Sequence, residues 1–127
     1  MPTAVTENIR VTVEAHYLEG ESAPDEDRYV FAYHVTIANE GRLRTQLRRR
    51  HWIITDGDGK VEEVEGPGVV GEQPILDHGD AHRYSSGCVL TTPVGTMEGT
   101  YEMHEVGGRV FAARIPRFGL QKPGALQ

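Results

Sequence analysis

The chain has little of several features, and the scarcest is cysteine. Cys88 is the only cysteine in 127 residues, so no disulfide can form within the chain. Long apolar runs are also missing, because no stretch approaches the roughly 20 apolar residues that cross a bilayer. The first residues, Met1 to Glu7, contain neither the basic nor the apolar segment of a secretory signal. These absences predict a soluble protein of the reducing cytoplasm, without membrane insertion.

Positive charge is the second shortage. Lys and Arg number 13 against 19 Asp and Glu, which gives a net charge of −6. This balance opposes binding to nucleic acid unless the basic residues are concentrated. One concentration exists, but acidic residues flank it and no aromatic residues alternate with it, so nucleic acid is not an expected partner. Regular alternation would separate its members onto two faces of a strand, Arg48 and Arg50 on one and Arg49 on the other. The cluster comprises Arg42, Arg44, Arg48, Arg49 and Arg50.

Catalytic signatures are missing as well. No G-x-S-x-G motif occurs, and Ser85-Ser86-Gly87 has no base that the sequence places beside it. Glu62 and Glu63 are adjacent in a predicted strand, so their carboxylates lie on opposite faces and do not form an acid–base pair. Cys88 is expected to be a small core residue. We therefore expect no catalytic residues, no cofactor and no enzymatic activity.

Short runs of alternating apolar and polar residues are what the sequence does contain. Their period of two predicts strands, which 15 Gly and 7 Pro separate. In the strongest run, Tyr29, Phe31 and Tyr33 share one face with later β-branched residues. The predicted strands are about 8–18, 28–39, 43–55, 60–65, 82–90, 97–104 and 109–115, and Pro116 is predicted to end the last one.

About seven strands without a convincing helix predict an all-β fold. We expect a single domain over residues 1–127, folded as an immunoglobulin-like β-sandwich. Because the disulfide of antibody domains cannot form, the fibronectin type III-like form is favoured, with Trp52 at the centre of the core. The ordered core is expected at about 8–120, followed by a short loose C-terminal tail.

A glycine-spaced run lies near the middle of the chain. Its G-x-G-x-x-G pattern occurs in dinucleotide-binding folds, where a helix follows it. Pro74 and Gly79 exclude such a helix, so a dinucleotide fold is rejected. Two interpretations remain open: the glycines permit a strained turn, or the loop amides bind phosphate with help from an arginine. The candidate anion-binding residues are Gly66, Gly68, Val69, Val70, Gly71 and Arg50.

The stretch Asp77-His78-Gly79-Asp80-Ala81-His82 is the best metal-site candidate by composition. Imidazole and carboxylate ligands suit divalent transition metals, and the two histidines are close in sequence. A polar surface turn is the simpler interpretation and the one favoured. No metal ligands are therefore assigned.

Several separated motifs occur together in a fixed order. They are Arg50-His51-Trp52-Ile53-Ile54-Thr55-Asp56, the run Gly66-x-Gly68-Val69-Val70-Gly71-Glu72-Gln73-Pro74, Tyr84-x-Ser86-Gly87, Gly95-x-Met97-x-Gly99-x-Tyr101-x-Met103 and Ile115-Pro116-x-Phe118. This set closely resembles the ApaG family of small bacterial proteins, and the resemblance extends from the first strand to Leu120. The chain departs from the family pattern before Tyr84, where His78 and His82 replace a usual Pro-Gly-Glu segment, so a family-wide metal role cannot rest on these two histidines.

The resemblance implies a fibronectin type III-like sandwich, which also occurs as a module in eukaryotic F-box proteins and in a DNA-polymerase-delta-interacting protein. It implies no established enzymatic activity. Bacterial members of the family are associated with cobalt resistance and magnesium efflux.

Three functional hypotheses follow. The leading one is a non-enzymatic cytoplasmic module that binds a protein partner through a sheet edge or through the surface around residues 66–74. A homodimer through a sheet edge is an open alternative within it. The second hypothesis is binding of phosphate, pyrophosphate or a nucleotide at the glycine loop. The third is direct binding of a divalent metal.

Overall fold

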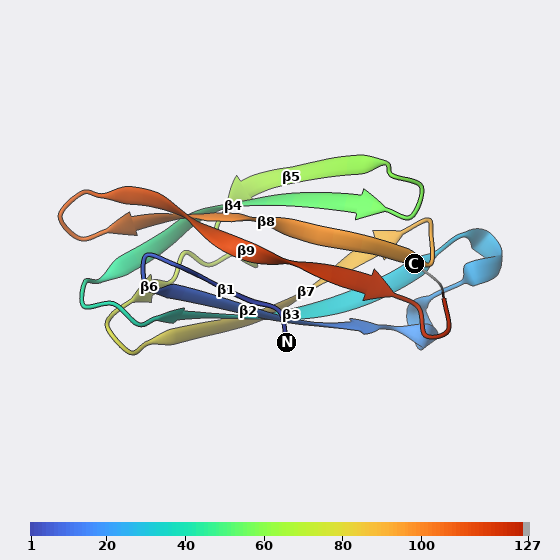
Figure 1. Cartoon of the computed structure of the whole chain (residues 1–127), viewed down its shortest axis with the longest axis horizontal. Coiled ribbons are helices and arrows are strands. Elements are labelled where there is room, and N and C mark those ends of the chain that lie inside the picture. Colours follow the sequence, from blue (N-terminus) through green and yellow to red (C-terminus); the bar gives the residue numbers. More distant parts are fainter. Residues whose placement is uncertain (126–127) are drawn as a thin grey trace.

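The computed structural model describes residues 1–125 as two antiparallel β-sheets packed face to face (Figure 1). The first sheet has the order β1-β2-β3-β7, and the second has the order β5-β4-β8-β9 with β6 paired to β4. This architecture confirms the predicted all-β sandwich. The strands are β1 (Thr3–Thr6), β2 (Ile9–Tyr17), β3 (Tyr29–Asn39), β4 (Thr45–Asp56), β5 (Val61–Pro67), β6 (Ile75–Leu76), β7 (Ala81–Leu90), β8 (Val94–Glu105) and β9 (Val110–Gln121).

The core lies between the two sheets and is built from alternate residues of each strand. In β3, Phe31, Tyr33 and Val35 are buried, as their spacing of two predicts. Trp52 of β4 is 3% exposed and meets the ring of Tyr33 edge-on, which confirms its predicted core position. Cys88 is a free, buried cysteine, also as predicted.

Residues 1–125 form nine strands rather than the predicted seven or so. The strand β1 pairs with β2 across a tight turn at Glu7 and Asn8, which both have positive φ. The strand β6 pairs only with Thr45 and Gln46 of β4. Both additional strands are too short, at 4 and 2 residues, for alternation to reveal them.

The prediction that Pro116 ends the last strand was wrong. The strand β9 continues to Gln121, and Pro116 falls where the pairing with β8 shifts between Met97 and Gly99. Proline is tolerated at such a bulge, and on an edge strand, because no ladder hydrogen bond is lost there. The predicted loose tail ends in residues 126 and 127, which lie outside the described residues.

The two sides of the sandwich differ. On one side β1 lies against β9, and the N–H of Arg114 donates to Thr6 Oγ1 at 3.0 Å. On the other side β5 and β7 are the last strands of their sheets and do not pair with each other. The sandwich is therefore open between β5 and β7. The part of the chain that the structure describes contains no helical segment with the length and hydropathy that membrane crossing requires.

Candidate functional site

The glycine loop and the arginine-rich part of β4 form one structural unit. The pairing of β4 with β8 shifts between Leu47 and Arg49, so Arg48 is an extra, bulged residue. Its carbonyl oxygen accepts the N–H of Gly68 at 2.8 Å and the side-chain amide of Gln73 at 3.0 Å. The bulge therefore supplies the carbonyl that fixes both ends of the loop along β4.

Each glycine of the motif has a steric reason. Gly66 pairs with Arg50, and a Cβ at residue 66 would lie 3.0 Å from the Arg50 guanidinium. Gly68 has a φ of 62°, and a Cβ there would overlap the carbonyl oxygen of Glu72. Gly71 has a φ of 79°, a conformation that glycine adopts at low cost. The turn geometry thus accounts for Gly68 and Gly71, and the contact with Arg50 accounts for Gly66.

The tip of the loop is itself strained. Val69 and Glu72 exchange backbone hydrogen bonds of 2.8 and 3.1 Å. Val70 and Gly71 between them both have positive φ, which defines a type I′ turn. A β-branched residue is a steric outlier there, at a cost of about 1–3 kcal/mol. Val69 is fully buried and Val70 is 63% exposed, so the turn anchors one valine in the core and presents the other to solvent.

Gly68→Ala is expected to lower the free energy of unfolding by about 2–3 kcal/mol, because the new Cβ meets a backbone carbonyl and the φ is positive. Gly71→Ala is the matched control, since its φ is also positive but the space around it is open; a loss of only about 1–2 kcal/mol is expected. Urea unfolding followed by Trp52 fluorescence measures both. Equal losses would show that the loop relaxes around residue 68.

The structure places Arg50 beside the loop but uses part of the predicted anion site internally. Arg50 Nη1 donates to the carbonyl oxygens of Pro67 at 2.9 Å and Gly68 at 3.1 Å. The amides of Gly68 and Val69 both donate to backbone carbonyls at 2.8 Å. Phosphate binding at Gly66, Gly68, Val69, Val70, Gly71 and Arg50 therefore stays a prediction, whereas the contacts of Arg50 show that it holds the loop in place.

The bulge also overturns the predicted division of the arginine cluster. Alternation places Arg48 on the same face as Arg50, but the extra residue shifts the alternation at this point. Arg48 Nε donates to the side chain of Gln46 at 3.2 Å on the outer face. Arg50 instead lines the space between the sheets together with Trp52. The arginines consequently do not form one continuous surface.

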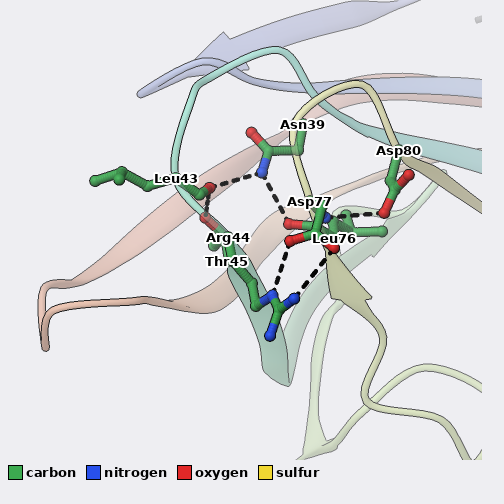
Figure 2. Close-up of polar contacts among 7 residues, drawn as sticks. All are labelled: Asn39, Leu43, Arg44, Thr45, Leu76, Asp77 and Asp80. Carbon is green, nitrogen blue, oxygen red and sulfur yellow. Dashed lines mark hydrogen bonds and ion pairs between the residues drawn. The ribbon is translucent and has the colours of Figure 1, made fainter.

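Figure 2 shows that the acidic residues of the metal candidate make structural contacts. Asp77 accepts a hydrogen bond from Arg44 Nε at 2.7 Å, which lowers the pKa of the Asp77 carboxyl. Asp80 accepts the backbone N–H of Asp77 at 2.9 Å. The buried Asn39 donates its side-chain amide to carbonyls of two different segments, both at 2.9 Å. This cluster joins the loop after β3 to the loop before β7.

The two histidines of the same stretch lie against different groups. His78 Nδ1 donates to the carbonyl oxygen of Gly41 at 2.6 Å. His82 stacks on Tyr84, and its Nε2 lies 3.8 Å from the Glu72 carboxylate. Across residues 1–125 no group of three or more His, Cys, Asp or Glu gathers as a metal site. Direct metal binding therefore stays a hypothesis without ligand geometry.

A cleft of about 270 Å³ lies between the free edges of β5 and β7. We call it the β5–β7 cleft. Core aromatic residues form its floor, β5 and β7 form its walls, and one arginine enters it from β4. The lining residues are Tyr33, Arg50, Trp52, Ile54, Glu62, Val64, Ser86, Gly87, Cys88, Val89 and Met97.

Neutral hydroxyl and thiol groups lie in and beneath this cleft. Tyr84 and Tyr101 join their hydroxyls in a hydrogen bond. Burial raises the pKa of Tyr33, Tyr84 and Tyr101, and the charge of Arg50 offsets a smaller part of each rise. Burial, followed by the negative charge of Glu62, raises the pKa of Cys88 to about 11. At neutral pH this cysteine is a thiol and not a thiolate nucleophile.

Sequence reasoning missed this tyrosine cluster. From the sequence, the three tyrosines Tyr33, Tyr84 and Tyr101 are recognised only as members of alternating strands or motifs. A buried phenol nevertheless needs a hydrogen-bond partner. Three tyrosines at inward positions of three strands were the signal that could have found them. Glu62 is exposed and lines the wall of the cleft.

Comparison with known proteins gives consistent matches. The ApaG domain family matches residues 19–105. Protein ApaG of Rhizobium meliloti (strain 1021) is 51% identical over 127 residues, covering 100% of this chain and 98% of that protein. Protein ApaG of Brucella anthropi is 55% identical over 123 residues, covering 97% and 95%. A crystal structure from Bordetella pertussis, described as a putative ApaA protein, has a TM-score of 0.89 and 44% identity, with 98% of each chain covered.

Proposed function

Because the chain belongs to the ApaG family, we propose that it is a non-enzymatic cytoplasmic binding module, which takes up an extended segment of a partner protein beside β7. Such binding, called β-strand addition, uses main-chain hydrogen bonds for affinity and side-chain pockets for specificity. The family's association with cobalt resistance and magnesium efflux is then indirect and passes through the partner. Three features of the chain support this proposal.

The observation that carries it is that β7 is an unprotected edge. Exposed edges are normally blunted by short length, charge, proline or bulges. The edge strand β1 has only 4 residues, β5 carries three glutamates, and β9 has a proline at a bulge. In contrast, β7 has 10 residues without proline, pairs with β3 without a register shift, and carries one Arg and one His.

The backbone of β7 offers hydrogen-bonding groups to a partner. The backbone N–H of Asn39 in β3 donates to the carbonyl oxygen of Asp80, just before β7, at 2.9 Å. The carbonyl oxygen of Val30, also in β3, accepts the N–H of Leu18, just after β2, at 2.8 Å. Odd-numbered residues of β3 therefore bond to the β7 side and even-numbered ones to the β2 side. Because Tyr33 pairs with Ser86, the even-numbered residues of β7 bond to β3. Those whose N–H and C=O point to the free edge are Ala81, Arg83, Ser85, Gly87 and Val89.

The β5–β7 cleft supplies the pockets. Even-numbered residues of β7, such as Ser86 and Cys88, direct their side chains into it. A strand paired with β7 places its own alternate side chains over the same space. The arrangement thus combines a free edge with an adjacent recess.

Gly87→Pro is expected to weaken the binding of extended peptides at least about tenfold, because the proline removes an edge N–H and crowds the incoming strand. Peptides selected on the immobilised protein from a random display library are the probes, with affinity measured by fluorescence anisotropy. Gly87→Ala is the matched control: it keeps the N–H, and its Cβ would lie 3.5 Å from the nearest atom, the Phe31 carbonyl oxygen. We expect it to bind like the wild type.

Amide hydrogen exchange locates the bound peptide independently of the variants. Slower exchange at Ser85 and Gly87 in the complex is expected, since these N–H groups become donors to the added strand. The variant Glu63→Pro, on the β5 edge, provides a second control. Peptides that bind equally well to Gly87→Pro, or that protect β5 instead, would contradict strand addition at β7.

Anion binding is the second candidate, favoured by one observation. The described residues place no carboxylate in an ion pair with Arg50, whose Nε and Nη2 remain available as donors. Calorimetric titration with pyrophosphate, ATP and diadenosine tetraphosphate separates this function from peptide binding. Heat and thermal stabilisation that Arg50→Lys abolishes, in a protein that selects no peptide, would favour the anion.

A further inference from the structure

The β5–β7 cleft has opposite charges at its two ends. Arg50 pairs with Gly66, and Ile54 pairs with Glu62. Arg50 and Glu62 therefore lie on neighbouring strands, four residue positions apart, which is roughly 13 Å along the strand. Both side chains line the cleft. The cleft is consequently bipolar along the direction that an added strand would follow.

The positive end is an uncompensated and half-buried guanidinium. Nη1 of Arg50 is used by the carbonyls of Pro67 and Gly68. Tyr33 and Tyr84 lie within electrostatic range of this guanidinium, and no carboxylate among residues 1–125 forms an ion pair with it. A charge removed from water without a partner is unfavourable. A carboxylate delivered into the cleft would relieve that cost through charge-assisted hydrogen bonds.

The negative end is a carboxylate on the β5 edge. Glu62 makes no ion pair among residues 1–125, in contrast to Glu63, which bonds to His51 at 2.7 Å. Glu62 lines the cleft together with Cys88, whose pKa is raised by burial and, to a smaller extent, by the charge of Glu62. A second recess next to Glu62 is lined by Lys60 and Asp56, which carry opposite charges. Glu62 is thus the unpaired charge that an inward side chain at this end would meet.

Proceeding from strand addition at β7, we propose that the added segment carries an acidic residue over Arg50 and a basic residue over Glu62. These two residues are four positions apart in the segment, because alternate side chains of a strand face the same side. The residue midway between them packs over Trp52 and is small or apolar. The partner is therefore a protein segment with an acidic and a basic residue in an i, i+4 relation and an extended conformation.

A second copy of this chain does not meet this description. The side chains that its own β7 would direct to the cleft are His82, Tyr84, Ser86 and Cys88, and none of them is a carboxylate. A symmetric continuation of the sheet would also bring two β5 strands toward each other, each with three glutamates. Like charges placed together oppose such pairing. The charges of the cleft therefore favour a different protein.

The test uses synthetic peptides of ten residues, the length of β7, on an alternating threonine–valine scaffold. Glutamate and lysine occupy the i and i+4 positions in one peptide, the reverse order occupies them in a second, and two glutamines in a third. One of the two charged orders is expected to bind about tenfold more tightly than the glutamine peptide at low salt. The preferred order reports whether the added strand runs parallel or antiparallel to β7.

Charge reversal in the protein assigns the basic position. Glu62→Lys is expected to weaken the affinity for the preferred peptide about fivefold. This variant should instead favour a fourth peptide, which carries glutamate at both positions. Glu63→Lys is the matched control, on the same strand but the opposite face, and should leave the ranking unchanged. Arg50→Lys should weaken selection for the acidic residue, and the loop contacts of Arg50 are checked by the thermal midpoint of that variant.

The outcomes separate this inference from the function on which it rests. If peptides protect β7 with no preference between charged and neutral residues, strand addition stands and the charge pattern is wrong. If no peptide binds, both are wrong. If sedimentation shows a dimer that Gly87→Pro dissociates, β7 is occupied by a second copy, which overturns the assignment of a different partner.

Discussion

Gly99→Ala is expected to remove a large part of the stability of the protein. A Cβ at residue 99 would overlap the carbonyl oxygen of His51 and lie 3.2 Å from the Cα of Trp52. Both atoms belong to the backbone of β4, the neighbouring strand in the middle of the second sheet. No side-chain rotation can therefore relieve the overlap, and the two central strands would have to separate. We expect a loss of at least about 4 kcal/mol, against a total stability of about 5–15 kcal/mol.

The surroundings of Gly99 explain why a strand interior needs this residue. The pairing of β8 with β9 shifts between Met97 and Gly99, and such a bulge bends and twists the strand. Glycine in a strand interior often marks such a close approach of two backbones.

Urea unfolding followed by Trp52 fluorescence measures this effect, with Gly87→Ala as the matched control. Gly87 also lies in a strand, but a Cβ there would make only an ordinary contact of 3.5 Å with Phe31. Its change in stability should stay within about 0.5 kcal/mol. A folded Gly99→Ala protein with wild-type stability would show that β4 and β8 separate easily, and would argue against the close packing of the second sheet.

The fold could be predicted from the sequence because its signal is local. Alternation in β3 identifies the inward residues, and the inferred sandwich and central Trp52 follow from it. The failures occur where alternation is interrupted. Bulges beside Arg48 and Pro116 each insert an unpaired residue, which shifts the face of the residues near it. Nothing in the composition of those segments signals an insertion, because a bulge is set by the partner strand.

The candidate site was predicted only in part for a related reason. The glycine loop was located by its motif, and its contact with Arg50 is observed. The β5–β7 cleft depends instead on which strands end each sheet, and sheet order arises from contacts between segments far apart in the chain. The edge at β7 looks like any other alternating run in sequence. Its lack of protection is apparent only after the other edges have been identified.

Alkaline pH is expected to destabilise the protein steeply through the buried tyrosines. Burial raises the pKa of Tyr84 and Tyr101 above the ordinary value of 10.0. Above that pH the unfolded chain has released these protons while the folded protein still holds them. The unfolded state then binds fewer protons, so the free energy of unfolding falls as pH rises. The stabilising contribution is fully present below about pH 10 and is lost progressively as pH rises toward the folded pKa.

The expected slope is about 1.4 kcal/mol per pH unit for each tyrosine, and about 2.7 for the two together. Urea unfolding at several values between about pH 8 and pH 12 measures it. Because the two hydroxyls share a hydrogen bond, they titrate as a pair, and the double variant Tyr84→Phe, Tyr101→Phe should remove the joint slope of these two tyrosines as a unit. A smaller decline that begins near pH 9 should persist, because burial raises the pKa of Cys88 from 9.0 to about 11 and also raises the pKa of Tyr33.

The slope, rather than the stability at neutral pH, separates titration from packing. Each single phenylalanine variant leaves one buried hydroxyl without its partner, at a cost of about 1–3 kcal/mol at every pH. That cost lowers the free energy of unfolding by the same amount at every pH, so it does not change the slope of the free energy against pH. Tyr17→Phe is the control, because Tyr17 packs edge-on against Phe31 on the first sheet, away from the paired hydroxyls. If the double variant kept the wild-type slope, the alkaline loss would arise elsewhere, and the floor of the β5–β7 cleft would be less sealed from water than its burial indicates.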